Sequence, residues 1–106
     1  GQYDQALSLY QAALRDFDGA PFYDPMVRAN LGKTLLAKDE LAAARAQFEQ
    51  AAQGDPSPLA AEALYHAAVI AQTQNNTTEA VAMFEKIVAD YPDSAYAPMA
   101  KEAARG

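Results

Sequence analysis

The stretch AQFEQAAQGDP at 46–56 returns as AMFEKIVADYP at 82–92, 36 residues further along the chain. Both copies begin with alanine, carry a Phe-Glu pair at the same place and end with proline. Self-similarity at a period of about 20–50 residues is typical of proteins built from stacked copies of one supersecondary unit. The recurrence therefore predicts a repeat architecture for the chain.

The repeated unit is expected to be helical. Alanine, leucine, glutamate, glutamine and arginine dominate the chain and favour helix, and no stretch shows the sustained apolar–polar alternation of a strand. Apolar residues instead recur three and four positions apart between short breaks rich in glycine, proline and asparagine. The pattern predicts six helices, at about 2–17, 25–37, 40–53, 58–74, 77–90 and 94–104.

Three helix starts carry capping signals. Asp39 is expected to cap the third helix, and Ser57, followed by Pro58, is expected to cap the fourth. Asn76 and Glu79 have the spacing of a capping box at the start of the fifth helix.

Alignment of the third and fifth helices on their phenylalanines reveals one set of structural positions. A small residue in each first helix is expected to let it approach its partner, the aromatic residue fills the space toward the next hairpin, and the proline ends the unit. These positions are Gly32, Ala44, Phe48 and Pro56 in one unit, and Ala68, Ala80, Phe84 and Pro92 in the next. The first helix joins the series 38 residues upstream of Phe48, at Tyr10.

This pattern resembles the tetratricopeptide repeat family, whose units of about 34 residues follow a small–small–aromatic–proline order. The resemblance implies an all-α fold, a right-handed solenoid of antiparallel helix hairpins within one domain spanning 1–106. It implies the second helix of a repeat at 2–17, full repeats at about 25–58 and 61–94, and the first helix of a further repeat at 95–104. The family tryptophan is absent, since Arg28 and Leu64 occupy its positions.

The stretch FEKIVADYPDSAYAPMAK at 84–101 is similar to cell-envelope members of this family in bacteria, of the Tol-Pal accessory and translocon-associated periplasmic types. In those members, tyrosine-proline-aspartate-serine joins one repeat to the next. The similarity implies a scaffold or adaptor in an envelope complex of the periplasm, with any membrane anchor outside these residues. The cytoplasm stays open as the alternative.

Composition argues against several classes of function. The 106 residues carry a formal net charge of −6, and their 8 Lys and Arg residues are scattered, unlike those of a nucleic-acid-binding protein. Without cysteine there is no disulfide and no thiolate metal site. His66 is the one histidine, and DFDG at 16–19 lacks the next oxygen ligand of a calcium loop. We therefore expect no enzyme activity, no cofactor and no metal.

The resemblance implies that the first helices of the hairpins line a concave groove that binds a peptide or protein segment. Packing against the neighbouring repeat is the alternative role for several of the residues in these slots. The candidates are Met26, Asn30, Lys33, Glu62, Tyr65, His66, Val69, Tyr96 and Met99, with Ala29, Leu36 and Gln72 beside them. Charge reversal at Lys33 or truncation of Tyr65 is expected to abolish binding and to leave the fold intact.

The ends of the chain suggest a second function. A repeat array is stable with about three units and polar caps, whereas the first and last expected helices here each lack a hairpin partner. Either further chain or another copy is expected to cover Tyr10 and Tyr96. The alternative to the groove is therefore a module that associates with itself through its terminal helices.

Overall fold

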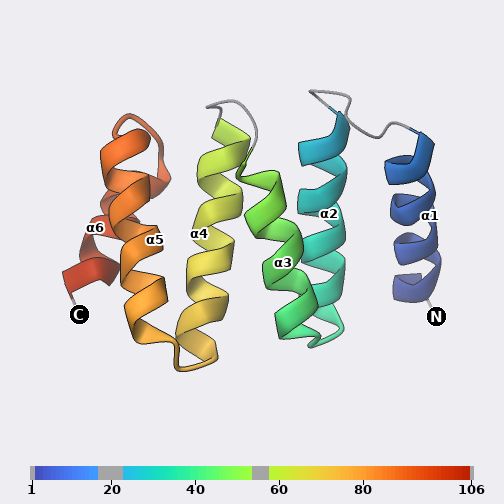
Figure 1. The fold of residues 1–106 in the computed structure, drawn as a ribbon, viewed down its shortest axis with the longest axis horizontal. Coiled ribbons are helices and arrows are strands. Elements are labelled where there is room, and N and C mark those ends of the chain that lie inside the picture. The colour runs from blue at the N-terminus through green and yellow to red at the C-terminus, as the bar shows by residue number, and fades with distance from the viewer. Residues whose placement is uncertain (1, 17–22, 54–57, 106) are drawn as a thin grey trace.

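The computed structural model describes residues 2–16, 23–53 and 58–105, and these fold into helices with no strand among them (Figure 1). The all-α fold expected from the sequence is confirmed. The helices are α1 (Gln2–Asp16), α2 (Tyr23–Ala37), α3 (Leu41–Ala51), α4 (Pro58–Thr73), α5 (Thr77–Asp90) and α6 (Tyr96–Arg105). Their bounds agree with the expected ranges to within about two residues, the usual uncertainty of a helix end.

The helices stand side by side in a row that runs from α1 at one end to α6 at the other (Figure 1). Each helix packs against the next along the chain, so that α2 with α3 and α4 with α5 form hairpins. The first helices also contact one another, α2 with α4 and α4 with α6. This is the layered arrangement of a helical solenoid, with α3 and α5 nearer the viewer in Figure 1.

Two apolar clusters form the core of the described part of the chain. One is built around Phe48 and the other around Phe84, whose side chains are 0% and 1% exposed. Met83 and Ala52 pack against both clusters and so join one repeat to the next. The two phenylalanines are thus buried at the positions where the repeat alignment places them, whereas Pro56 lies outside the described residues and Pro92 is exposed.

Gly32 allows α2 and α3 to approach closely. A Cβ atom placed on Gly32 would lie 2.9 Å from Cζ of Phe48 and 3.0 Å from both Cε atoms. The nearest group across the hairpin is therefore the ring of Phe48. The small residue of α2 makes room for the aromatic residue of α3.

The turns between the helices of a hairpin differ from the expected caps. Asp39 has a φ of 67° and Asn75 a φ of 65°, so both residues are left-handed and end the helices before them. The residue after each left-handed position donates its backbone N–H to a carbonyl in the last turn of the preceding helix. Glu40 N donates to Leu35 O at 2.9 Å, and Asn76 N donates to Ala71 O at 2.8 Å. These bonds form a Schellman motif at equivalent positions of the two repeats.

The expected cap at Asp39 is therefore wrong, because the N-cap of α3 is Glu40. Asn76 is the N-cap of α5, but its side chain makes no capping hydrogen bond. The expected capping box does not form, since the N–H of Asn76 is already bonded to Ala71 and Glu79 binds Arg45 instead. Ser57 lies outside the described residues. Among those residues, no helix has the length and apolar character needed to cross a membrane.

Arg45 ties one repeat to the next on the side of the second helices. Its guanidinium donates to Glu49 Oε1 at 2.9 Å, to Gln74 Oε1 at 3.1 Å and to Glu79 Oε2 at 2.6 Å. The bond to Glu79 is the main cause that raises the pKa of Arg45 above its usual value, against the opposing effect of burial. Lys38 makes a similar link backward, to Asp4 of α1 at 2.5 Å.

Replacement of Arg45 by alanine is expected to lower the free energy of unfolding by about 1–2 kcal/mol, because three charge-assisted hydrogen bonds are lost together. Arg105→Ala is the matched control, since among the described residues Arg105 pairs with Glu102 of its own helix alone, in an exposed position, and we expect less than about 0.5 kcal/mol there. Urea unfolding at low and high salt measures both. Equal losses in the two variants would contradict the bridging role of Arg45.

Candidate functional site

The candidate residues fall on one face of each first helix. Positions three and four apart share a face of a helix, as the candidates do on α2, on α4 and on α6. Contacts between helices join these three faces into one surface, which we call the first-helix face. It consists of Met26, Asn30, Lys33, Glu62, Tyr65, His66, Val69, Tyr96 and Met99.

An ion pair links α2 to α4 on this face. Lys33 Nζ lies 2.8 Å from Glu62 Oε1, and the Lys33 side chain remains 48% exposed. The hydrogen bond from Lys33 is the largest of the effects that hold the pKa of Glu62 below its usual value. The pair leaves Lys33 with donors for a further acceptor, but Glu62 offsets its charge. A clamp for a terminal carboxylate, which needs concentrated positive charge, is therefore a poor fit to this position.

His66 joins this pair to the core. Its imidazole stacks on the ring of Phe48, with centroids 4.9 Å apart, and its Nε2 lies 3.7 Å from Glu62 Oε1. Burial is the largest effect on the pKa of His66 and lowers it, while Glu62 acts in the opposite direction. His66 is thus a half-buried, predominantly neutral packing group with one edge on the first-helix face.

Tyr65 is the centre of an aromatic cluster that extends the face to α6. Its ring lies 5.3 Å from that of Tyr96 and meets Phe84 edge-on at 5.8 Å. Both tyrosines remain partly exposed. Since Tyr65 also packs against the core around Phe84, its truncation would disturb the fold, contrary to the expectation from the sequence.

Apolar side chains are exposed at the two ends of this face. Met26 on α2 is 44% exposed and Met99 on α6 is 45% exposed, while Val69 is partly buried. Leu36 and Gln72 are also exposed, but Ala29 is 2% exposed and belongs to the core around Phe48. The expectation that Ala29 lines the face is therefore wrong: its small side chain is covered where α2 packs on its neighbours.

The described residues contain no group of three or more His, Asp or Glu side chains placed to hold a metal ion. The DFDG segment, considered above as a calcium loop, lies outside the residues whose side chains are described. The chemistry available on the first-helix face is hydrogen bonding, ion pairing and apolar contact.

A solenoid of helical hairpins with exposed methionine and tyrosine side chains along its first helices belongs to the class of helical-repeat proteins. A model of the tetratricopeptide repeat family matches residues 1–57 and 29–95, and the chain belongs to this family. Repeats of this family generally mediate the binding of other proteins or peptides, without catalysis. Neither the curated proteins nor the solved structures gave a significant match.

Lowering the pH from about 7 to about 5 is expected to destabilise the fold in part through His66. Its pKa is lower in the folded chain than the ordinary 6.5, so below that pH the unfolded chain binds a proton that the folded chain does not. Glu62 acts only at lower pH, because its pKa is held below 4.5 and its contribution is lost as the pH falls through that lower value.

The matched variant is His66→Gln, which cannot titrate. Between the two pH values it is expected to lose less unfolding free energy than the wild type, because the unfolded chain no longer gains a proton at this position. Urea unfolding at both pH values measures the difference. A variant with the same pH dependence as the wild type would show that the burial of His66 has no consequence for titration.

Proposed function

We propose that the first-helix face binds a segment of another protein, extended or helical, and that the chain is a scaffold or adaptor without enzyme activity. The observation that carries the proposal is the exposure of Met26 and Met99 on either side of the partly exposed Tyr65–Tyr96 pair. Apolar groups gathered on one face of a soluble protein are characteristic of interaction surfaces.

The chemistry of the face suggests how a segment is held. Methionine side chains are flexible and polarizable, so they adapt to different apolar partners, and tyrosine offers a broad apolar ring with a polar tip. The remaining donors of Lys33 and the carboxylate of Glu62 suit the backbone or polar side chains of the bound segment. Apolar anchors with a few polar contacts provide affinity and orientation together.

The proposed setting is a bacterial envelope complex in the periplasm. It rests on the similarity of Tyr-Pro-Asp-Ser at 91–94, between α5 and α6, to the linker between repeats in envelope members of the family. A role with nucleic acid is not proposed, because the net charge of −6 opposes a polyanion.

The proposal is tested by capture from an extract of the source cells, followed by quantitative mass spectrometry. The bait is the wild type or the double variant Lys33→Glu/Met99→Ser, which changes two exposed side chains and spares Tyr65. Proteins held by the wild type are expected to be lost from the variant. A synthetic segment of the captured protein, titrated against both chains, is expected to bind the variant at least about tenfold more weakly.

Two controls separate binding from folding. Lys86→Glu reverses a charge on exposed α5, in the other layer, and is expected to bind like the wild type. The exchange Lys33→Glu/Glu62→Lys keeps the ion pair between α2 and α4 but inverts its charges. Weaker partner binding by this variant would show that the partner recognises the Lys33 charge, and that loss of the ion pair is not the cause. Retention of all partners by Lys33→Glu/Met99→Ser would exclude the first-helix face as the binding surface.

A further inference from the structure

Three ionisable side chains meet at one carboxylate oxygen where α2 packs against α4. Lys33 Nζ of α2 lies 2.8 Å from Oε1 of Glu62, and Nε2 of His66, one turn further along α4, lies 3.7 Å from the same oxygen. A hydrogen bond between nitrogen and oxygen is about 2.7–3.2 Å long. Lys33 therefore holds this oxygen, and His66 is a second donor placed just outside hydrogen-bonding distance of it.

The imidazole of His66 is held in place beside this oxygen. One of its faces stacks on the ring of Phe48, with centroids 4.9 Å apart, and Phe48 is 0% exposed. The Lys33 side chain, by contrast, is 48% exposed, against 26% for Glu62. A change in the pairing of these groups therefore moves the exposed Lys33 more readily than the stacked imidazole.

The charged side chains that act on His66 are known for the described part of the chain. They are Glu62, which favours the protonated imidazole, and Lys33, which opposes it. The neighbouring elements present uncharged rings instead: Phe48 from α3, Tyr65 from α4 and, packed against Tyr65, Phe84 from α5 and Tyr96 from α6. The protonation of His66 is therefore linked to the state of the Lys33–Glu62 pair.

The three groups change charge in a fixed order as the pH falls. Burial is the largest effect that lowers the pKa of His66 below 6.5, and the hydrogen bond from Lys33 is the largest that holds the pKa of Glu62 below 4.5. His66 therefore gains its proton while Glu62 is still ionised. The group is neutral as a whole near pH 7 and carries a charge of +1 once His66 is protonated.

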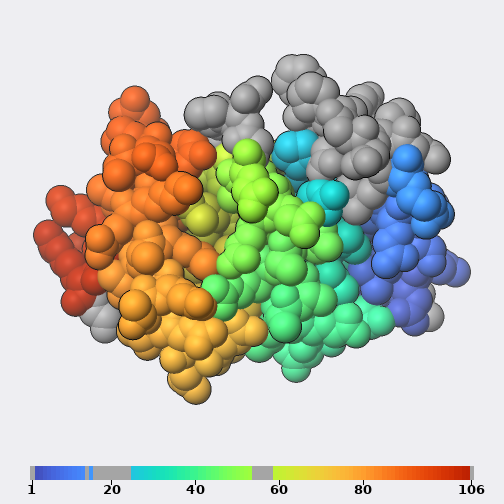
Figure 2. Space-filling model, in the orientation of Figure 1, coloured from blue at the N-terminus to red at the C-terminus, as the bar shows by residue number. Residues whose placement is uncertain are grey.

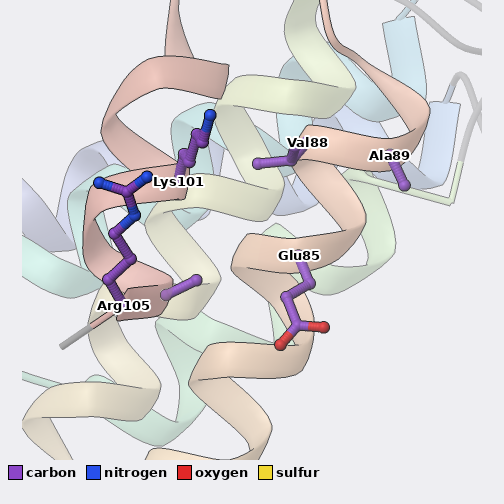
Figure 3. A pocket seen from close by; sticks show the side chains of 6 residues that line it. Glu85, Val88, Ala89, Lys101 and Arg105 are labelled. Atoms are coloured by element: carbon purple, nitrogen blue, oxygen red, sulfur yellow. The ribbon is translucent and has the colours of Figure 1, made fainter.

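Lys33 is the basic residue that a bound segment meets at this junction. Arg28 of α2 donates to a side chain of α3 instead. Figure 3 shows Lys101 and Arg105 of α6 at the hollow between α5 and α6, which Glu85 also lines. The charge available on the α2–α4 part of the first-helix face is therefore set by Lys33 and its two neighbours.

The negative charge of the chain is not concentrated on the first helices. Helices α2, α4 and α6 contain four basic and three acidic residues, whereas α3 and α5 contain two basic and four acidic residues. Exposed charges more than about 8–10 Å apart are largely screened at physiological ionic strength. An acidic side chain at the α2–α4 junction therefore responds mainly to the local charge, despite the net charge of −6.

We propose that Lys33, Glu62 and His66 form an acid-operated site for a carboxylate side chain of the bound segment. On acidification the imidazolium of His66 competes with Lys33 for Oε1 of Glu62, and the released ammonium of Lys33 pairs with the carboxylate. This inference rests on the proposed function of the first-helix face and states how pH regulates it. An acidic segment binds about two- to fivefold more tightly at pH 5.5 than at pH 7.5, the usual strength of an exposed ion pair.

The switch is tested first on the chain alone, by nuclear magnetic resonance between about pH 8 and pH 4.5. His66 is the only histidine, so its ring signals report its protonation directly. The side-chain signal of Lys33 is expected to shift with the protonation of His66 and to lose this step in His66→Gln. Lys86 on α5 is the internal control and is expected to show no such step. A Lys33 signal that stays constant while His66 titrates would overturn the proposal.

Two variants test the direction of the coupling. Glu62→Gln is expected to lower the pKa of His66, because the carboxylate that favours the imidazolium is gone. Lys33→Met is expected to raise the pKa of His66, because the opposing charge and the competing donor are both removed. A histidine that only packs on Phe48 would keep the same pKa in both variants, and that result would contradict the switch.

The second test uses the synthetic segment of the captured protein, titrated by calorimetry at pH 7.5 and pH 5.5. The wild type is expected to bind it more tightly at pH 5.5, and His66→Gln is expected to bind equally at both pH values. Replacement of one acidic residue of the segment by its amide is expected to abolish the pH dependence. By linkage, the bound segment is expected to raise the pKa of His66.

The possible failures are distinguishable. Binding by this face with the same affinity at both pH values, or of a segment without an acidic residue, would overturn the switch and leave the proposed function intact. Binding elsewhere on the molecule would overturn both, even if the Lys33 signal of the free chain follows His66.

Discussion

Replacement of Phe48 by alanine is expected to lower the free energy of unfolding by about 3–5 kcal/mol, a large share of the stability of a small domain. The ring is 0% exposed, touches the space left by Gly32 and stacks on His66 of the following repeat. Its removal leaves a cavity that borders three helices, so no single side chain can move in to fill it. Phe84→Ala is expected to have a similar effect in the second cluster, where the ring is 1% exposed.

Urea or thermal unfolding, followed by circular dichroism, measures both losses. Leu9→Ala, at a few micromolar, is the control for a large apolar side chain that is 71% exposed, and it is expected to change stability by less than about 0.5 kcal/mol. A melting temperature of either phenylalanine variant within a few degrees of the wild type would contradict the alignment of the two repeats.

The second large effect on the free energy of unfolding is expected from Gly32→Ala. Replacement of glycine by alanine inside a helix is usually stabilising. Alanine has a higher helix propensity than glycine by about 1 kcal/mol, but the added Cβ would lie 2.9 Å from a buried ring carbon. Overpacking of this kind typically costs about 1–3 kcal/mol. We expect the steric cost to prevail, with a net loss of about 1–2 kcal/mol.

A double-mutant cycle isolates the contact. Phe48→Leu removes the ring atoms that the new Cβ would meet, so Gly32→Ala is expected to be neutral or stabilising in the Phe48→Leu background. Equilibrium unfolding of the four chains gives the coupling free energy. An equal effect of Gly32→Ala in both backgrounds would show that the approach of α2 to α3 is not limited by the Phe48 ring.

The arrangement of helices was predictable because its signals are local and repeated. Apolar spacing and the breaks at proline, glycine and asparagine determine where each helix runs, and the recurrence of Phe48 as Phe84 identifies the repeat. The cap at Asp39 was predicted wrongly: Asp39, like Asn75 in the next hairpin, is a residue type that suits an N-cap but ends the preceding helix with a left-handed backbone. Aspartate and asparagine suit both roles, so residue type alone does not decide between them.

The candidate site was predictable in outline but not in its contacts. Helical periodicity places Lys33 and Tyr65 on first helices, yet the pairing of Lys33 with Glu62 depends on how far α2 lies from α4. The same holds for the stacking of His66 on Phe48, which turns an apparently polar position into a packing one. Both contacts are set by the tertiary distance between helices, on which sequence spacing carries no information.

The two layers of the solenoid also offer different surfaces to a partner. Figure 2 shows the side formed largely by α3 and α5, with part of α4 visible between them. Arg45 of α3 forms its bridge to Glu79 of α5, whereas the partly exposed Tyr65 and Tyr96 belong to α4 and α6. A binding partner therefore has two chemically distinct sides to choose from, and the proposed function requires the first helices.

The most direct test of this function is a nuclear magnetic resonance titration of the isotopically labelled chain with the captured partner segment. We expect chemical-shift changes at Lys33, Glu62, His66 and Met99, and little change at Lys86 of α5. Changes concentrated on α3 and α5, with the first-helix face unaffected, would contradict the assignment of binding to that face.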